Sequence, residues 1–144
     1  MRSALVRRGR SYIVRFDHGE DLNSGLKKFV SENSIKTATV TLLGAIEKGE
    51  LVTGPERPVL PAEPHWVRFE NVWELFGTGI ITFKDGEVSL HIHSSLGKDS
   101  KTLVGCLRKE AMVFVTVEAF IQEIITDGMT REFDATSGCS LLSL

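Results

Sequence analysis

Apolar and polar side chains alternate along much of the chain, which is the pattern of strands that bury one face. The segment "SYIVRF" (residues 11–16) places Tyr12, Val14 and Phe16 on one side of an extended chain. Ile13 and Arg15 fall on the other side. The sequence therefore predicts a strand in this region.

Residues 21–34, "DLNSGLKKFVSENS", change to helical spacing. Their apolar positions lie three to four residues apart and are Leu22, Leu26, Phe29 and Val30. This spacing predicts an amphipathic helix of about three turns with a solvated opposite face. The preceding turn ends in Glu20 and Asp21, either of which can cap the helix.

The rest of the chain is rich in β-branched residues and punctuated by turns. All four prolines fall within residues 55–64, which predicts a loop or an extended crossing. "KDG" at residues 84–86 is a hairpin signal between two alternating segments. The longest strand is expected to need a bulge. Strands are predicted at residues 35–53 in two parts, 66–83 in one or two parts, 87–97, 102–108, 111–125 and 137–144.

One helix among about eight strands indicates an α+β fold. We expect a curled, mostly antiparallel sheet, as a sandwich or partial barrel, with one main helix packed on it. Residues 1–144 are expected to form a single domain, because a chain of this length can bury its own core. So many strands leave exposed edges, which a sheet protein can cover by assembling with copies of itself.

Composition narrows the possible functions. The chain is 42% hydrophobic and 25% charged, with a net charge of −2. It therefore lacks the excess of basic residues that is typical of proteins that bind nucleic acid mainly through phosphate contacts. Neither a signal peptide nor a segment of about 20 apolar residues is visible, so no membrane association is expected. The two cysteines, Cys106 and Cys139, are too few for a disulfide framework, and a reducing cytoplasm is predicted.

The segment "LHIH" contains two of the four histidines. On a strand, His91 and His93 point to the same side, with their Cα atoms about 6.5 Å apart, while Leu90 and Ile92 point into the core. Two imidazoles at this spacing can bind one metal ion. The alternative is a pair of ordinary surface histidines.

The next predicted strand adds a thiol to this face. "TLVGCLR" (residues 102–108) follows after a short turn and is expected to pair with the histidine strand, which brings Cys106 close. A thiolate and two imidazoles suit Zn²⁺. The alternative for Cys106 is a small buried apolar residue. His65 is a possible fourth ligand, whereas His18 is expected to be solvated.

Several segments resemble one known family. "RFDHGEDLNSGLKKFVSENSIKTATVTLLGAI" is similar to the opening of the plant and prokaryote conserved (PPC) domain, and "DGEVSLHIHSSLG" is similar to its His-x-His segment. "KTLVGCLR", "VEAFIQEII" and "TREFDATSGCSLLSL" continue the resemblance to the end of the chain. The resemblance implies an antiparallel sheet with a packed helix, a homotrimer, and a role in binding DNA or a partner protein.

The chain departs from that family at two places. Many members have histidine where this chain has Cys106, and the replacement keeps a metal ligand at the matching position. The plant proteins carry a separate Arg-Gly-Arg-Pro arm that binds DNA, whereas "RRGRS" here lacks the proline and runs directly into the first strand. Arg7, Arg8 and Arg10 are still the candidates for phosphate contacts, although a solvated strand end is the alternative.

Two functions follow from these observations. One is a homotrimeric, Zn-binding regulatory or interaction module that contacts DNA or a partner protein. The other is a Zn-dependent enzyme of unknown substrate, because three protein ligands and an open position are typical of catalytic zinc. Such an enzyme needs a carboxylate to move protons, for which Glu74 and Glu118 are candidates, although both can equally be solvated or paired.

Overall fold

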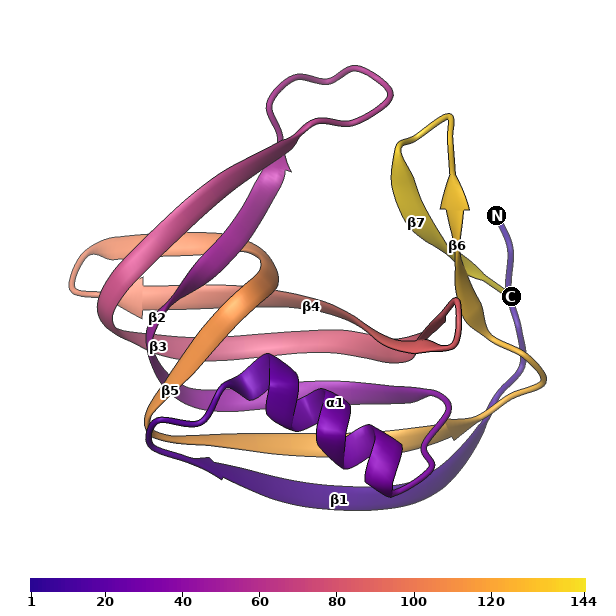
Figure 1. Cartoon of the computed structure of the whole chain (residues 1–144), viewed down its shortest axis with the longest axis horizontal. Helices are drawn as coiled ribbons and strands as arrows, with labels where there is room; N and C mark the ends of the chain where they lie inside the picture. The colour runs from indigo at the N-terminus through magenta and orange to yellow at the C-terminus, as the bar shows by residue number, and fades with distance from the viewer.

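The computed structural model describes residues 1–144 and contains one helix and seven strands. Figure 1 shows a strongly curved sheet with the helix packed against its concave side. The elements in chain order are β1 (Arg7–Asp17), α1 (Leu22–Glu32), β2 (Ala38–Pro55), β3 (Pro64–Lys84), β4 (Glu87–Lys98), β5 (Lys101–Ile125), β6 (Thr130–Asp134) and β7 (Cys139–Ser143).

The main sheet has five strands in the order β1-β5-β2-β3-β4, and every pairing is antiparallel. The first part of β5 also pairs with β4, so the sheet curls back on itself without forming a closed barrel. Strands β6 and β7 form a separate hairpin, which stands beside the turn between β3 and β4 (Figure 1). The predicted α+β class is therefore confirmed.

Helix α1 forms where its spacing predicts. The side chain of Asp21 caps its first turn by accepting a hydrogen bond of 2.8 Å from the Ser24 amide. Leu22, Leu26 and Val30 are fully buried against the inner face of the sheet. Asn23 is also buried, which the apolar pattern does not indicate, because its amide donates to the carbonyl oxygens of residues 108 and 109 on β5.

Most strand predictions are confirmed in position but not in extent. Strands β2 and β5 are each continuous, where two strands apiece were predicted. The strand register shifts near three residues with positive φ, which are Gly44, Lys109 and Val115. These shifts bend the long strands instead of ending them. The turn at Asp85 and Gly86 has positive φ at both residues, as a tight hairpin requires. Strand β6 was not predicted.

The face of the sheet opposite α1, here called the outer face, carries large apolar side chains in contact with solvent. Ile13, Leu43, Phe76 and Phe120 are 80%, 59%, 58% and 50% exposed. They lie on four adjacent strands, because Ile13 pairs with Phe120 and Leu43 pairs with Phe76. An apolar surface that spans several strands is typical of an interface with another protein.

Candidate metal centre

The candidate site lies where β5 separates from β4. Strands β4 and β5 pair from Lys98 and Lys101 as far as His93 and Cys106, and beyond this point the two strands diverge. The remaining edge of β4, residues 87–92, has no β5 partner. The site therefore lies at a fork in the sheet, where a strand edge is free.

The structure brings together the three predicted ligands. The donor atoms of His91, His93 and Cys106 all lie within 4.8 Å of one another. Alternation along β4 turns both histidines to the outer face, while Ile92 between them is fully buried. His93 and Cys106 are direct partners in the β4–β5 register, so the predicted pairing is confirmed.

The geometry of the cluster fits a transition metal. The Nε2 atoms of His91 and His93 are 3.0 Å apart. Two nitrogens bound to a tetrahedral Zn²⁺ at about 2.0–2.1 Å would be about 3.3 Å apart, so only a small adjustment is needed. The Cys106 sulfur lies within reach of the same point, because a bound nitrogen and sulfur are about 3.6 Å apart. Two nitrogens and one sulfur favour Zn²⁺ over Mg²⁺ or Ca²⁺.

Burial sets the protonation of the cluster. It lowers the pKa of His91 to about 4, with the charge of Arg131 as the next cause, so His91 is neutral near pH 7 and its lone pair is available. Burial also raises the pKa of the Cys106 thiol, which the charge of Arg108 opposes. A metal must therefore displace a proton from Cys106 when it binds.

Residues 4–125 match the model of the Plants and Prokaryotes Conserved (PCC) domain, the family also abbreviated PPC. The chain belongs to this family. A comparison with curated proteins found no match.

Solved structures of PPC-like proteins share the whole fold. The metal-containing protein AF0104 from Archaeoglobus fulgidus is 26% identical, with a TM-score of 0.89 and full coverage of both chains. A PPC protein from Pyrococcus horikoshii is 27% identical, with a TM-score of 0.87, over 100% of this chain and 98% of that one. A candidate DNA-binding protein from Bacteroides thetaiotaomicron is 23% identical over 97% of this chain and 98% of that one, with a TM-score of 0.78, which shows the fold alone.

The other histidines of this PPC domain lie outside the cluster. His65 contacts Glu56 at 2.6 Å across the base of the proline-rich loop, so it does not contribute the fourth ligand considered from the sequence. His18 is exposed, and its Nδ1 accepts a hydrogen bond from the Val115 amide.

The carboxylates considered as proton carriers also lie elsewhere. Glu74 and Glu118 are exposed, and neither belongs to the ligand cluster. Glu74 is four residues along β3 from Thr78, the register partner of His93. Glu118 pairs with Leu43, which is separated from β4 by the whole width of β3.

The three candidate arginines near the N-terminus, Arg7, Arg8 and Arg10, differ in their surroundings. Arg7 and Arg8 are exposed at the start of β1. Arg10 instead makes two side-chain bonds to Glu123, of 2.7 and 2.8 Å, and a third of 3.0 Å to the Asn33 carbonyl at the end of α1. The Arg10 side chain therefore stabilises the fold. Only Arg7 and Arg8 of the three remain without an ion pair and available for phosphate contacts.

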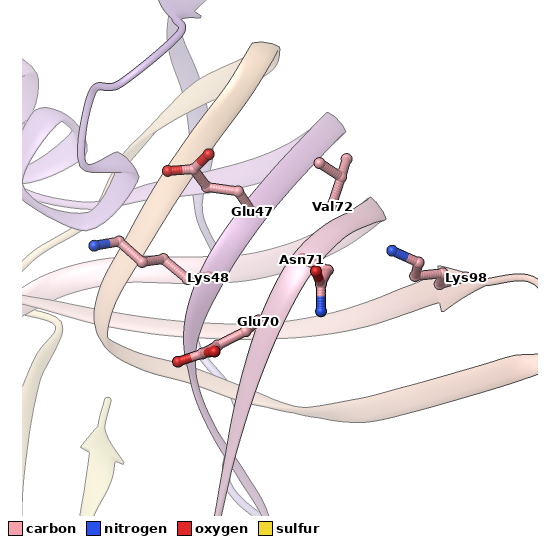
Figure 2. Close-up of a pocket in the computed structure, with 6 residues that line it drawn as sticks. All are labelled: Glu47, Lys48, Glu70, Asn71, Val72 and Lys98. Atoms are coloured by element: carbon pink, nitrogen blue, oxygen red, sulfur yellow. The ribbon is translucent and has the colours of Figure 1, made fainter.

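A cleft of about 400 Å³ lies on the curved part of the β2–β3 hairpin, away from the histidines. Figure 2 shows Glu47, Lys48 and Glu70 on one side of it and Asn71, Val72 and Lys98 on the other. Its two carboxylates and two ammonium groups balance, and it includes none of the predicted site residues.

A second cleft of about 460 Å³ opens beside the fork. It is lined by α1, by the free edge of β4 and by residues 107–109 of β5. Sequence reasoning also missed Arg131 of β6, whose charge reaches His91 and Cys106. Arg131 is 25 residues from Cys106 in the chain and belongs to the strand that the pattern did not reveal, so no local signal pointed to it.

Proposed function

We propose that this PPC protein is a regulatory or interaction module of one domain, residues 1–144, that assembles as a homotrimer and binds one Zn²⁺ per chain. His91, His93 and Cys106 are the proposed ligands. The observation that carries this proposal is the convergence of their donor atoms within 4.8 Å on one face of the fork. AF0104, a protein of the same fold, is described as metal-containing, which supports the proposed metal site.

The proposal includes a reducing, cytoplasmic setting and contact with DNA or a protein partner. Both cysteines are free thiols in the structure, which suits a compartment where Cys106 stays available to a metal. Helix α1 has 11 residues and lacks the length and apolar character needed to cross a bilayer. Arg7 and Arg8 are the proposed phosphate contacts, whereas Arg10 is held by Glu123.

Metal analysis of the purified protein tests the centre directly. We expect about one equivalent of zinc per chain after purification without chelators. His93→Ala should lower the affinity by at least about two orders of magnitude, since even outer-shell partners of a metal contribute about 10–100-fold. Cys106→Ser should weaken binding, because an alcohol is a poor ligand at neutral pH, while Cys139→Ser on exposed β7 is the matched control.

The proposal also predicts what metal removal leaves behind. The core contains 21 buried apolar residues that do not depend on the site, so the metal-free protein should keep its fold. Circular dichroism of the chelated protein checks this. Zinc far below one equivalent, or full occupancy retained in His93→Ala, would return the two histidines to an ordinary surface pair.

A Zn-dependent enzyme is the second candidate. It is favoured by one observation, the lack of a fourth side-chain ligand in the cluster, which leaves a coordination position for water or substrate. The spectrum of the Co²⁺-substituted protein tests this, because an open position makes it respond to added small ligands. A spectrum that no small ligand alters would indicate a closed, structural site.

A further inference from the structure

The cleft beside the fork has an excess of positive charge. Its basic lining residues are Lys27, Lys84, Arg108 and Lys109, against two acidic ones, Asp85 and Glu87. Lys109 is paired with Glu50, but Arg108 makes no ion pair. Arg108 lies two residues after Cys106 on β5, so strand alternation places both side chains on the same side, and the Arg108 charge acts on Cys106 and His91.

Arg131 contributes a second guanidinium that is buried. Its residue is only 9% exposed, and the hairpin of β6 and β7 that carries it contacts β3. Its Nη1 donates a bond of 2.9 Å to the Ser140 carbonyl oxygen, but its buried Nε has no partner, and no carboxylate pairs with it. A buried cation without an anionic partner is costly, so such a group is expected to meet an anion.

A second buried polar atom without a partner lies on the same part of the sheet. Thr82 is fully buried, and its hydroxyl has no hydrogen-bond partner. In the β3–β4 register, Thr82 pairs with Ser89 and Ile80 pairs with His91, so Thr82 and His91 face the same side one pair apart. Thr82 therefore offers an unpartnered donor one residue pair from His91, and the charge of Arg131 acts on the same histidine.

The main charges that act on the three groups of the site are positive. After burial, the causes that lower the pKa of His91 are the charges of Arg131, His93 and Arg108. Burial and then Arg108 lower the pKa of Arg131, and none of the main charge effects on His91, Cys106 or Arg131 comes from a carboxylate. A bound Zn²⁺ would add two positive charges to this site, and one Cys106 thiolate would balance only one of them.

We propose that the site binds an oxyanion group, carboxylate or phosphate, of a small molecule, with Arg131 and Arg108 as its donors next to the metal. A guanidinium presents paired N–H donors that match both kinds of oxyanion, and the Thr82 hydroxyl offers a further donor one residue pair from His91. Arg108 also lines the neighbouring cleft of about 460 Å³, which gives a small molecule a route to this donor. This inference rests on the proposed metal centre.

Titration of the Co²⁺-loaded protein tests the inference. Binding of Co²⁺ is verified first from the thiolate-to-metal charge-transfer band. Acetate and inorganic phosphate are then added in separate titrations at constant ionic strength, and the visible d–d bands are followed. Either anion should shift these bands with saturation, and the one that binds more tightly identifies the class of oxyanion. Sodium chloride is the control for a general salt effect.

Two variants assign the donors. Arg108→Gln alters an exposed side chain that the fold does not need, and it should weaken oxyanion binding at least tenfold while Co²⁺ loading persists. Arg131→Lys keeps the positive charge but loses the paired N–H donors of the guanidinium, and should also weaken oxyanion binding. Arg68→Gln, at an exposed arginine paired with Glu70, is the matched control and should bind like the wild type.

The outcomes separate the two proposals. Absence of the charge-transfer band would mean that the metal centre itself is wrong. A normal band with no anion response, or with a response equal in wild type and Arg108→Gln, would overturn the oxyanion site. In that case water molecules would be the hydrogen-bond partners of the Arg131 Nε and the Thr82 hydroxyl.

Discussion

Gly79 sets how closely β3 approaches β4 beside the histidine pair. A Cβ atom at this position would lie 2.3 Å from the His91 carbonyl oxygen and 2.7 Å from the Ile92 Cα. Both atoms belong to the backbone and cannot rotate away. Gly79 pairs with Ile92, so any side chain here must push the histidine strand outward.

We therefore expect Gly79→Ala to destabilise the fold by about 1–3 kcal/mol, the usual cost of overpacking, and to weaken metal binding. Urea unfolding of the metal-free protein measures the first effect, and competition with a chelator measures the second. Gly97→Ala on β4 is the matched control, because its Cβ would meet no atom within 4 Å. Equal metal affinity in both variants would show that the strand spacing does not position the ligands.

The cluster of proposed metal ligands was predictable from the sequence because it depends on local rules. Strand alternation places His91 and His93 on one face, and a short turn aligns Cys106 with His93. Arg131 depends on how a distant hairpin folds over the sheet, which no local pattern encodes. His65 was ambiguous for the same reason, because its position depends on the course of the proline-rich loop, where Glu56 contacts it.

At the scale of elements, one ion pair joins three parts of the fold. Arg10 of β1 is bound by Glu123 of β5, and the same guanidinium donates to the carbonyl oxygen of Asn33 at the end of α1. The hydrogen bonds from Arg10 lower the pKa of Glu123 from its ordinary value of 4.5 to about 2. Gly9 leaves room for this carboxylate, since a Cβ there would lie 2.6 Å from Glu123 Oε2.

This pair predicts the acid sensitivity of the fold. The pKa of Glu123 is lower in the folded than in the unfolded chain, so its stabilisation is complete above about pH 4.5 and is lost as the pH falls towards 2. Urea unfolding between about pH 6 and pH 2.5 should show a smaller loss of stability in Glu123→Gln than in the wild type. Glu32→Gln, which removes an exposed carboxylate paired with Lys28, is the control. Parallel wild-type and Glu123→Gln curves would contradict this assignment.

The lengths of the elements were harder to predict than their types. Residues 35–53 were expected to form two strands, and this segment contains Gly44 and Gly49. Both glycines instead allow close contact between β2 and β5, where a Cβ would lie 2.3 Å and 2.6 Å from backbone oxygens of β5. Val115 has a φ of 61°, a conformation that β-branched residues rarely adopt, so its position in a bulge could not be read from residue preference. The continuity of β2 and the bulge at Val115 both depend on pairing with neighbouring strands that are distant in the sequence.

At the scale of the whole molecule, charge limits the proposed contact with DNA. The net charge is −2, and of the three candidate arginines only Arg7 and Arg8 are free, because Arg10 is paired with Glu123. We expect weak binding without sequence preference that largely disappears when salt is raised about fourfold, because phosphate contacts release counterions. Arg7→Ala with Arg8→Ala should weaken binding and flatten its salt dependence, while Lys101→Ala at the β4–β5 turn is the control. Fluorescence anisotropy of a labelled duplex measures both, and tight binding at high salt would indicate a different, specific surface.

The outer face gives the proposed homotrimer a physical basis. Exposed apolar residues on β1, β5, β2 and β3 form one surface, and Val104 on β5 adds a further one that is 55% exposed. A solvent-exposed apolar area of this kind favours self-association, which would remove it from water. His93 lies in the same cross-strand row as Thr78, Thr41, Phe120 and Ile13, so the proposed metal centre borders this surface.

Light scattering at micromolar concentration should therefore give about three times the chain mass of 15.9 kDa. Leu43→Asp combined with Phe76→Asp should produce monomers, because each buried carboxylate would lose its hydration without gaining a partner. The variant should stay folded, since both side chains are exposed in the single chain. Val59→Asp, at an exposed apolar residue of the proline-rich loop, is the matched control and should remain a trimer. A monomeric wild type would exclude the trimer, and a trimer that survives the double substitution would place its interface on another face.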